Sequence, residues 1–394
     1  MRIALFSDTY PPQINGVATA TYTLAKAMRE NGHEILIVTV AEAKQKKLTF
    51  EDGIIRIPGV TVKRLYNYKF TWLYNFKAYK MIKDFNPDII HVQTEAGVGI
   101  FGRICAGKLH VPLIYTYHTL YENYTYYVTR GIEPMDSIAK KFVKWLSTLV
   151  GDTTSGFTTT SLKTKRALRK YGVKDYINVI PNGLDLDMFK EENLDLTKIK
   201  EIKDKYSLNG KFTMLILGRI AKEKSNELLL RWIKNYIEKT NDRDLKILIV
   251  GDGPALNELE NLAKELNIAD IVSFVGCINH DEIPLYYRVS DLYISASTTE
   301  TQGLTYNEAM ASRLLVMARF DDNLVDAVID GKTGFFFEDE ESFIKQLMKI
   351  RALSDSEKET IISNAYKNNS EKFSMELFYE RMLNVYNKAL RKFW

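Results

Sequence analysis

Two acidic residues eight positions apart, Glu300 and Glu308, stand where an apolar run typical of a strand gives way to a helical pattern. If Glu300 lies in the loop and Glu308 on the second helical turn, up to about 12 Å separates their backbones. Gly303 permits close approach of a ligand, and the free amides of Gly303, Leu304 and Thr305 would attract an anion. The spacing fits a nucleotide sugar, which has hydroxyls at both ends and phosphates in the middle. The alternative is that both glutamates are helix-start residues favoured by the helix dipole.

Two other strand-to-helix loops, called corners below, follow predicted strands in the same half of the chain. Arg219 and Lys224 come after the strand 214–217, and two cations at this spacing can bind one diphosphate. Asp252 lies in a tight turn that opens the next helix. Basic residues in loops are usually only solvated, which is the alternative for this pair. Because ligands of open parallel sheets bind beyond the carboxyl ends of the strands, we expect the corners to form one site.

The first half of the chain contributes Gly16 and His118. Gly16 ends a turn-rich loop after the first strand, where it could bring backbone amides close to a phosphate or serve only as a turn residue. His118 follows the predicted strand 113–117 and begins a polar, aromatic loop. Most histidines are structural, but the position of this one at a strand end makes it a candidate for contact with the ligand.

Apolar runs alternate with helix-like segments along the whole chain, which predicts α/β structure with parallel sheets covered on both faces. The alternation stops in the charged stretch 190–211 and restarts near residue 212. The pattern predicts two doubly wound, Rossmann-like domains facing across a cleft. We expect an N-terminal acceptor and membrane-associating domain (1–190), a C-terminal nucleotide-sugar-binding domain (191–374), and a last helix (375–394) that could pack back on the first domain.

Composition limits the class of protein. The 394 residues exceed the usual size of a single core, and 45% hydrophobic with 26% charged residues is ordinary for a globular protein. Two cysteines, Cys105 and Cys277, build no disulfide framework and suit a reducing cytoplasm. The N-terminal apolar run is too short for a signal sequence, and no apolar run is long enough to predict a transmembrane helix.

Taken together, these motifs resemble those of the retaining GT-B glycosyltransferases of family four, and the resemblance covers essentially the whole chain. Within the family the chain is most similar to bacterial 1,2-diacylglycerol 3-glucosyltransferases. That likeness rests on three runs, which are 118–128, 218–225 and 298–306. Gln302 stands where many members carry Phe, which leaves glucose or galactose open as the sugar.

The resemblance implies roles for the motif residues. Arg219 and Lys224 would bind the diphosphate of the donor, and Glu308 would hold the ribose hydroxyls. Glu300 and the amides of Gly303, Leu304 and Thr305 would contact the sugar and phosphate. The remaining assignments are Gly16 against the phosphate, Asp252 among the nucleotide-sugar-binding residues, and His118 beside the reacting sugar, with His118 and Glu300 as the catalytic residues.

The implied reaction is retaining transfer of a hexose, glucose in α linkage, from a UDP-sugar to the 3-hydroxyl of 1,2-diacylglycerol. Arg219, Lys224 and the helix N-terminus would stabilise the departing phosphates without a metal, and no tightly bound cofactor is expected. The acid pairs Asp185/Asp187 and Asp242/Asp244 match metal-binding spacing, but turn capping and solvation explain them better. Two alternatives stay open: a glycolipid, polyprenyl-linked or soluble acceptor, and a non-catalytic nucleotide-sugar-binding protein.

The stretch 63–83 carries six basic residues, seven aromatic residues and no acid. Read as a helix, it places Lys69, Lys77, Lys80 and Lys83 on one side, and with Trp72 these residues would bind an anionic membrane surface. A second basic run at 140–145 could join it. The alternative is a domain helix whose lysines extend over a buried aromatic face.

The expected partners are therefore a UDP-sugar, diacylglycerol and anionic membrane lipids. Nucleic acid is disfavoured, because the formal charge is only +4 and no recognised nucleic-acid motif accompanies the basic stretch. We expect a cytoplasmic protein, peripheral on the inner face of the cell membrane. The sequence gives no indication of the oligomeric state.

Overall fold

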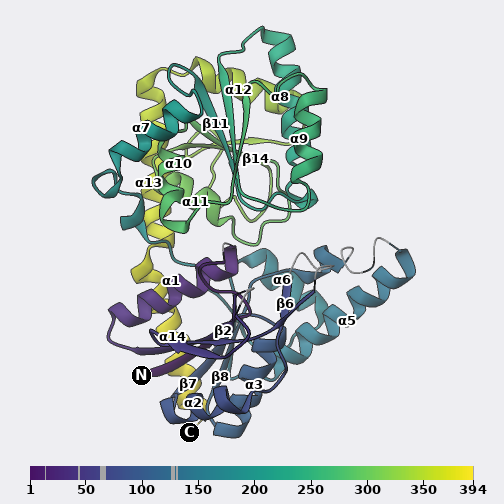
Figure 1. Ribbon diagram of the computed structural model, residues 1–394, viewed down its shortest axis with the longest axis vertical. Helices are drawn as coiled ribbons and strands as arrows, with labels where there is room; N and C mark the ends of the chain where they lie inside the picture. The colour runs from purple at the N-terminus through teal and green to yellow at the C-terminus, as the bar shows by residue number, and fades with distance from the viewer. Residues whose placement is uncertain (14, 43–44, 63–67, 126–128, 130–131, 394) are drawn as a thin grey trace. The chain divides into compact units, whose positions relative to one another are not determined.

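The computed structural model describes residues 1–13, 15–42, 45–62, 68–125, 129 and 132–393 (Figure 1). The chain divides into two compact units. The first unit combines Met1–Gly183 with Met375–Trp394, and the second is Leu184–Ser374. Each unit contains its own mainly parallel sheet with helices on both faces, so the predicted α/β, doubly wound fold class is confirmed.

The sheet of the first unit has the strand order β10-β9-β8-β7-β1-β2-β4-β3. Its pairings are parallel except for the β3–β4 pair. The strands are β1 (Arg2–Phe6), β2 (Glu34–Val40), β3 (Thr49–Glu51), β4 (Ile54–Ile57), β7 (Ile89–Val92), β8 (Leu113–Tyr117), β9 (Gly156–Thr159) and β10 (Ile177–Val179). A separate antiparallel pair joins β5 (Val60–Val62) to β6 (Tyr68–Phe70).

Helices cover this sheet on both sides. One apolar cluster involves α2 (Phe76–Phe85), α3 (Gly97–Leu109), α5 (Glu133–Asp152) and α6 (Leu162–Tyr171). The other involves α1 (Gly16–Glu30) and the last helix, α14 (Met375–Phe393). Asn15 caps α1 by accepting hydrogen bonds from the amides of Val17 and Ala18, which fixes the helix start just after the loop that follows β1. The last helix thus belongs to the core of the first unit.

The second unit has a sheet in the order β13-β12-β11-β14-β15-β16, with every pairing parallel. The strands are β11 (Phe212–Leu217), β12 (Leu245–Val250), β13 (Val272–Gly276), β14 (Leu292–Ser295), β15 (Leu315–Arg319) and β16 (Phe335–Phe337). Helices α8 (Asn226–Thr240), α9 (Leu256–Glu265) and α12 (Glu340–Ala352) pack on one face. Helices α7 (Leu196–Lys205), α10 (Ile283–Arg288), α11 (Leu304–Ala311) and α13 (Asp355–Phe373) pack on the other.

The predicted helix through the basic stretch is wrong in its first half. Tyr68–Phe70 form strand β6, so Lys69 lies on a strand and not beside Lys77 on a helix. The helix α2 begins only at Phe76, where the side chain of Asn75 caps it by accepting from the amide of Ala78. The helical interpretation failed because a capping residue and the β5–β6 pairing override a periodicity of basic residues. Residues 63–67 of the stretch lie outside the described residues.

The sequence also did not predict four short strands, β3, β5, β6 and β16, which have only three residues each. No helix among the described residues is long and apolar enough to cross a membrane.

Candidate functional site

The acidic corner of the second unit has the geometry that its sequence predicts. Glu300 lies in the loop after β14, and Glu308 is on the second turn of α11. Gly303 precedes the helix with φ of 76°, a left-handed conformation, and an added Cβ would lie 2.6 Å from the Leu324 side chain. A glycine is therefore required here on both grounds. The amides of Leu304 and Thr305 begin the helix, as an anion site would need.

Glu308 is a buried carboxylate with one strong partner. Its side chain is 7% exposed, and Oε2 accepts a hydrogen bond of 2.9 Å from the hydroxyl of Tyr287. Burial raises the pKa of Glu308 to about 7, although the hydrogen bond from Tyr287 opposes the shift. The carboxyl group therefore gains from a ligand that brings further hydrogen-bond donors to it.

Glu300 is held differently. Its Oε1 lies 2.7 Å from Nζ of Lys224, and both side chains are partly exposed. The side-chain amide of Asn323 also donates to the backbone oxygen of Glu300. The structure thus brings together the cation of the β11 corner and the first acid of the β14 corner, two motifs that are 76 residues apart.

The loops after β11 and β12 touch through their backbones. A Cβ added to Gly251 would lie 1.9 Å from the carbonyl oxygen of Gly218, and one added to Gly253 would lie 2.1 Å from that of Ile220. The glycines that flank Asp252 are therefore required by this close packing. Asp252 is exposed, and its Oδ1 accepts from the amide of Gly253, so the side chain caps its own turn.

Arg219 is the second residue after β11 and is exposed. Since β12, β11 and β14 are neighbours in a parallel sheet, their carboxyl ends lie at one edge. Arg219, Lys224, Asp252 and Glu300 all lie at that edge, in the segments that follow these strands.

The sequence did not single out two tyrosines that support α11. Tyr287 holds Glu308 and also lies 3.0 Å from the carbonyl oxygen of Thr305. Tyr293 donates a hydrogen bond of 2.7 Å to Oγ1 of Thr305. Both occur in apolar runs and read as ordinary core residues, so only the fold reveals that their hydroxyls fix the helix start.

In the first unit, His118 ends a chain of buried side chains. Its Nε2 lies 2.6 Å from Oε1 of Gln93, whose Nε2 is 3.1 Å from Nε2 of His91. His91 is in turn bonded by the hydroxyls of Thr116 and Tyr386, each at 2.7 Å. One signal for this network is present in the sequence, a histidine inside the apolar strand β7, but its link to α14 required the structure.

The chain of hydrogen bonds fixes which ring nitrogen of His118 carries the proton. Burial lowers the pKa of His118 to about 4, so the ring is neutral at pH 7. Oε1 of Gln93 only accepts, so Nε2 of His118 donates to it and Nδ1 is the acceptor. Within the described residues Nδ1 has no hydrogen bond, which leaves it able to accept one from a ligand hydroxyl.

Gly16 is exposed and is the first residue of α1. It follows β1, and His118 follows β8, so both lie at the carboxyl edge of the first sheet. Part of the aromatic loop after His118, residues 126–128, lies outside the described residues.

At least three of the four acids with metal-like spacing have other partners, and Asp187 forms an ion pair with Lys190. Asp242 accepts from Arg351 and Tyr236, and Asp244 forms an ion pair with Lys211. Among the residues that the structure describes, no group of three or more His, Cys, Asp or Glu side chains could hold a metal ion.

Solved structures with the same two-unit architecture define the class of fold, GT-B. Anabaena Alr3699/HepE in complex with UDP and glucose aligns over 98% of each chain with a TM-score of 0.77 and 18% identity. Sucrose-phosphate synthase from Thermosynechococcus elongatus aligns over 99% of each chain, also with a TM-score of 0.77, at 19% identity.

Sequence comparison identifies the family. Residues 14–188 match Glycosyltransferase Family 4, and residues 198–368 match Glycosyl transferases group 1. Over its whole length the chain is 34% identical to the alpha-monoglucosyldiacylglycerol synthase of Streptococcus pneumoniae, of which it covers 89%. It is 32% identical to the protein of the same name from Acholeplasma laidlawii, of which it covers 100%. The chain belongs to the family-four glycosyltransferases.

Proposed function

We propose that this glycosyltransferase moves glucose from UDP-glucose to the 3-hydroxyl of 1,2-diacylglycerol with retention, giving an α-linked glycolipid. The names of the two full-length relatives support the product. The observation that carries the donor site is the Lys224–Glu300 pair beside the N-terminus of α11, with Glu308 buried one turn further on.

The donor residues follow from these contacts. Arg219 and Lys224 bind the diphosphate, and Glu308 accepts hydrogen bonds from the ribose hydroxyls. Glu300 and the amides at 303–305 contact the sugar and its phosphate. HepE, which shares the fold, has been solved with UDP-glucose, and this supports a uridine nucleotide as the donor.

The reaction needs charge stabilisation more than proton transfer by a side chain. The bond between the sugar C1 and the diphosphate oxygen breaks, and the acceptor oxygen bonds to C1 on the same face. The acceptor proton passes to the departing phosphate. Lys224, Arg219 and the α11 amides stabilise the growing negative charge without a metal, while neutral His118 accepts a hydrogen bond from the sugar through Nδ1.

The test is an acceptor panel. The protein is incubated with labelled UDP-glucose or UDP-galactose and one of three acceptors: diacylglycerol in anionic vesicles, a polyprenyl phosphate, or a soluble sugar. Label in a diacylglycerol product with UDP-glucose supports the proposal. Transfer only to another acceptor would support a glycosyltransferase with a polyprenyl-linked or soluble acceptor. Donor binding without any transfer would support a non-catalytic nucleotide-sugar-binding protein.

We expect Gln93 to act by positioning His118. Gln93→Ala removes the acceptor for Nε2–H, so the ring loses its orientation and kcat should fall by about 10- to 100-fold. The affinity for UDP-glucose, measured by calorimetry, should stay within about twofold, since the donor residues of the second unit are intact.

Gln93→Glu separates positioning from simple stability. It restores the acceptor but places a carboxylate against the imidazole, which raises the pKa of His118. The variant should regain part of kcat at high pH and lose it as the pH falls towards 6. Equal loss at every pH in both variants, together with a lowered melting temperature, would show a structural role only.

Membrane binding is the second part of the proposal, and the contacts in the structure change which residues we assign to it. Lys77, Lys80 and Lys83 are exposed on α2, and Trp72 and Phe76 before and at its start are 82% and 72% exposed. Lys69 does not fit, because its Nζ donates to the carbonyl oxygen of Ala41 and burial lowers its pKa. The membrane-binding segment is therefore residues 72–83, and we place the protein on the cytoplasmic face of the cell membrane.

Charge reversal on α2 should weaken vesicle binding. Each lysine near an anionic surface adds about 1 kcal/mol, so Lys77→Glu with Lys80→Glu should reduce partitioning by at least about 30-fold at low salt. Flotation with vesicles of anionic and of neutral lipid measures the effect. Lys264→Glu, an exposed position on α9 of the second unit, is the control. Equal binding to both vesicle types would contradict the electrostatic mechanism.

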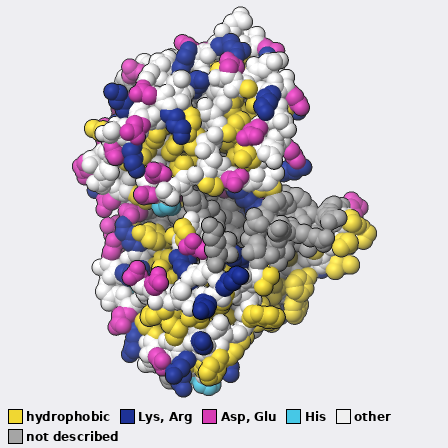
Figure 2. All heavy atoms as spheres, viewed as in Figure 1, with side chains coloured by type: hydrophobic (Ala, Val, Ile, Leu, Met, Phe, Trp, Pro, Cys, Tyr) yellow, Lys and Arg dark blue, Asp and Glu magenta, His cyan; other side chains and the backbone are white. Residues whose placement is uncertain are grey.

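Helix α5 carries a second candidate surface. Five apolar side chains recur at intervals of three and four residues and are 43–68% exposed: Met135, Ile138, Phe142, Trp145 and Leu149. Lys140, Lys141 and Lys144 lie on the same helix. Figure 2 shows hydrophobic side chains gathered along the lower edge of the region where α5 lies. The stripe has the composition of a helix that lies in a membrane interface.

A further inference from the structure

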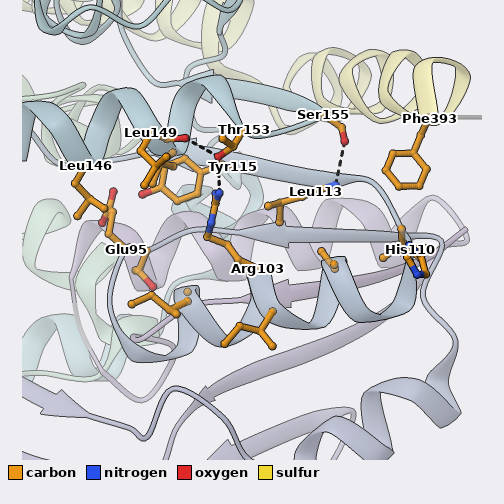
Figure 3. A pocket seen from close by; sticks show the side chains of 18 residues that line it. Glu95, Arg103, His110, Leu113, Tyr115, Leu146, Leu149, Thr153, Ser155 and Phe393 are labelled. Atoms are coloured by element: carbon orange, nitrogen blue, oxygen red, sulfur yellow. Dashed lines mark hydrogen bonds between the residues drawn. The ribbon is translucent and has the colours of Figure 1, made fainter.

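The first unit contains a cavity of about 570 Å³ that none of the motifs above uses. It lies between α3, α5 and β8, and its long axis follows α3 (Figure 3). In the figure, Glu95 and Leu146 are at one end and His110 and Phe393 at the other. Much of the wall is apolar, formed by Ile100, Ile104, Val111, Leu113, Leu146 and Val150. The volume is in the range of sites that take a small-molecule ligand.

Three residues that line this cavity each have a buried polar atom without a hydrogen-bond partner among the described residues. These atoms are Oε1 of Glu95, Nη1 of Arg103 and the hydroxyl of Tyr115. Other atoms of two of these groups are used: Glu95 accepts from the hydroxyl of Tyr121, and Nη2 of Arg103 donates to Thr153. Tyr115 lies near the Glu95 carboxyl group without making a hydrogen bond of normal geometry. Orphaned polar groups in one cavity call for a ligand with complementary atoms.

The chemistry of the three atoms defines that ligand. Arg103 and Tyr115 each offer a donor, and Glu95 offers an acceptor. A diacylglycerol has the opposite set, two ester carbonyl oxygens and one hydroxyl, attached to hydrocarbon chains that suit the apolar walls.

Two further observations favour a membrane lipid over a soluble ligand. Leu149 belongs both to the exposed stripe of α5 and to the lining of the cavity, so the apolar surface continues into it. Glu95 is two residues from Gln93, which holds His118, so the polar end of the cavity lies at the edge of the sheet that carries the candidate site.

We propose that this cavity binds the acceptor lipid: one acyl chain lies between α3 and α5, the ester carbonyls accept from Arg103 and Tyr115, and the glycerol hydroxyl donates to Glu95. The assignment rests on the proposed function, since it names the subsite for the diacylglycerol acceptor. Glu95 would hold the hydroxyl that is to be glycosylated while the lipid binds, and the hydroxyl would turn its proton to the departing phosphate when it reacts.

Photolabelling tests the location directly. A diacylglycerol with a diazirine at the end of one acyl chain is irradiated with the full chain in micelles, and the labelled peptides are identified by mass spectrometry. We expect label within residues 100–113 or 146–155. Label confined to α2 or to the second unit would overturn the assignment.

Gly107 offers a way to block the cavity. It lines the cavity, and a Cβ added there meets no atom within 4 Å, so Gly107→Phe adds a ring at the cavity wall without a clash at the backbone. Labelling of this variant should fall by at least about tenfold. Each buried methylene of the acyl chain contributes about fourfold in affinity, and the ring would displace several of them. Lys108→Phe adds the same ring at the next position, which is outside the lining, and should label like the wild type.

The polar end has its own test. An ether-linked dialkylglycerol lacks both carbonyl oxygens and should compete for labelling about tenfold less well than the ester-linked lipid. In Tyr115→Phe the difference should shrink, whereas equal competition in the wild type would overturn the polar contacts. Labelling of the cavity without any sugar transfer would refute the proposed function and leave the lipid site standing. Transfer to diacylglycerol with label elsewhere would support the proposed function and refute the cavity as the lipid site.

Discussion

Lys224→Ala should lower kcat for glucosyl transfer by about 10²- to 10³-fold, which is the usual loss when one group that stabilises a developing negative charge is removed. The side chain lies 2.7 Å from Glu300, at the edge of the sheet where α11 begins. Under the proposed function, its removal takes away a cation at the leaving diphosphate and also frees the carboxylate that should contact the sugar. The rate of labelled glycolipid formation at saturating UDP-glucose measures the loss.

Lys222→Ala provides the matched control. Lys222 is two residues away on the same 3₁₀ turn, η5 (Lys222–Lys224), and its ion pair with Glu258 is exposed on both sides. The charge change is the same, yet kcat should stay within about twofold because exposed ion pairs contribute little. Similar losses in both variants would show that Lys224 acts only through the general charge of the surface.

The ion pair between Lys224 and Glu300 allows a second test of the role of Lys224. If the two side chains act as one unit, Lys224→Ala combined with Glu300→Gln should cost less than the sum of the single changes in activation free energy. Strict additivity would mean that the two groups contact the donor independently.

Glu308→Ala should weaken binding of UDP-glucose by about 10²- to 10⁴-fold, because hydrogen bonds to a charged carboxylate contribute about 1.5–3 kcal/mol each and the ribose offers two donors. Isothermal calorimetry with UDP-glucose measures the affinity without turnover. Intact donor binding in this variant would remove Glu308 from the nucleotide site.

The pH dependence of binding gives the sharper readout for Glu308. Its pKa is raised to about 7, mainly by burial, so below pH 7 the group is protonated and can accept the ribose hydroxyls only poorly. Donor affinity should therefore rise about tenfold per pH unit up to pH 7 and level off above it. UDP-glucose is the suitable probe because its diphosphate diester does not titrate in this range. Glu308→Gln keeps the shape of the side chain and should abolish the dependence.

The arrangement of the loops in the second unit could be predicted largely from the sequence. Loops that follow the strands of a parallel sheet must lie at one edge, and the structure does bring Lys224 into contact with Glu300. Their role in binding the donor stays a prediction. A glycine at position 303 also indicated a close approach at the start of the helix. The structure shows why a glycine is needed there, because Gly303 has a positive φ and no room for a side chain.

The supporting residues could not be predicted, because their contacts join distant parts of the chain. Tyr386 reaches His91 across 295 residues, and Tyr287 reaches Glu308 from another helix. Their side chains fit an apolar pattern, and only the packing shows what the hydroxyls bond. The error at Lys69 has a related cause. The pairing of strand β6 with β5 determines the surroundings of Lys69, and the helical periodicity of basic residues carries no information about that pairing.

The structure of the product tests the central proposal most directly. The protein is incubated with UDP-glucose and 1,2-diacylglycerol in anionic vesicles, and the extracted lipid is analysed by proton NMR. We predict a glycolipid with one glucose on the 3-hydroxyl of glycerol and the small anomeric coupling of an α linkage. A β-linked product would contradict retention, and UDP-glucose that stays unconsumed or is only hydrolysed in the presence of diacylglycerol would contradict the proposed function itself.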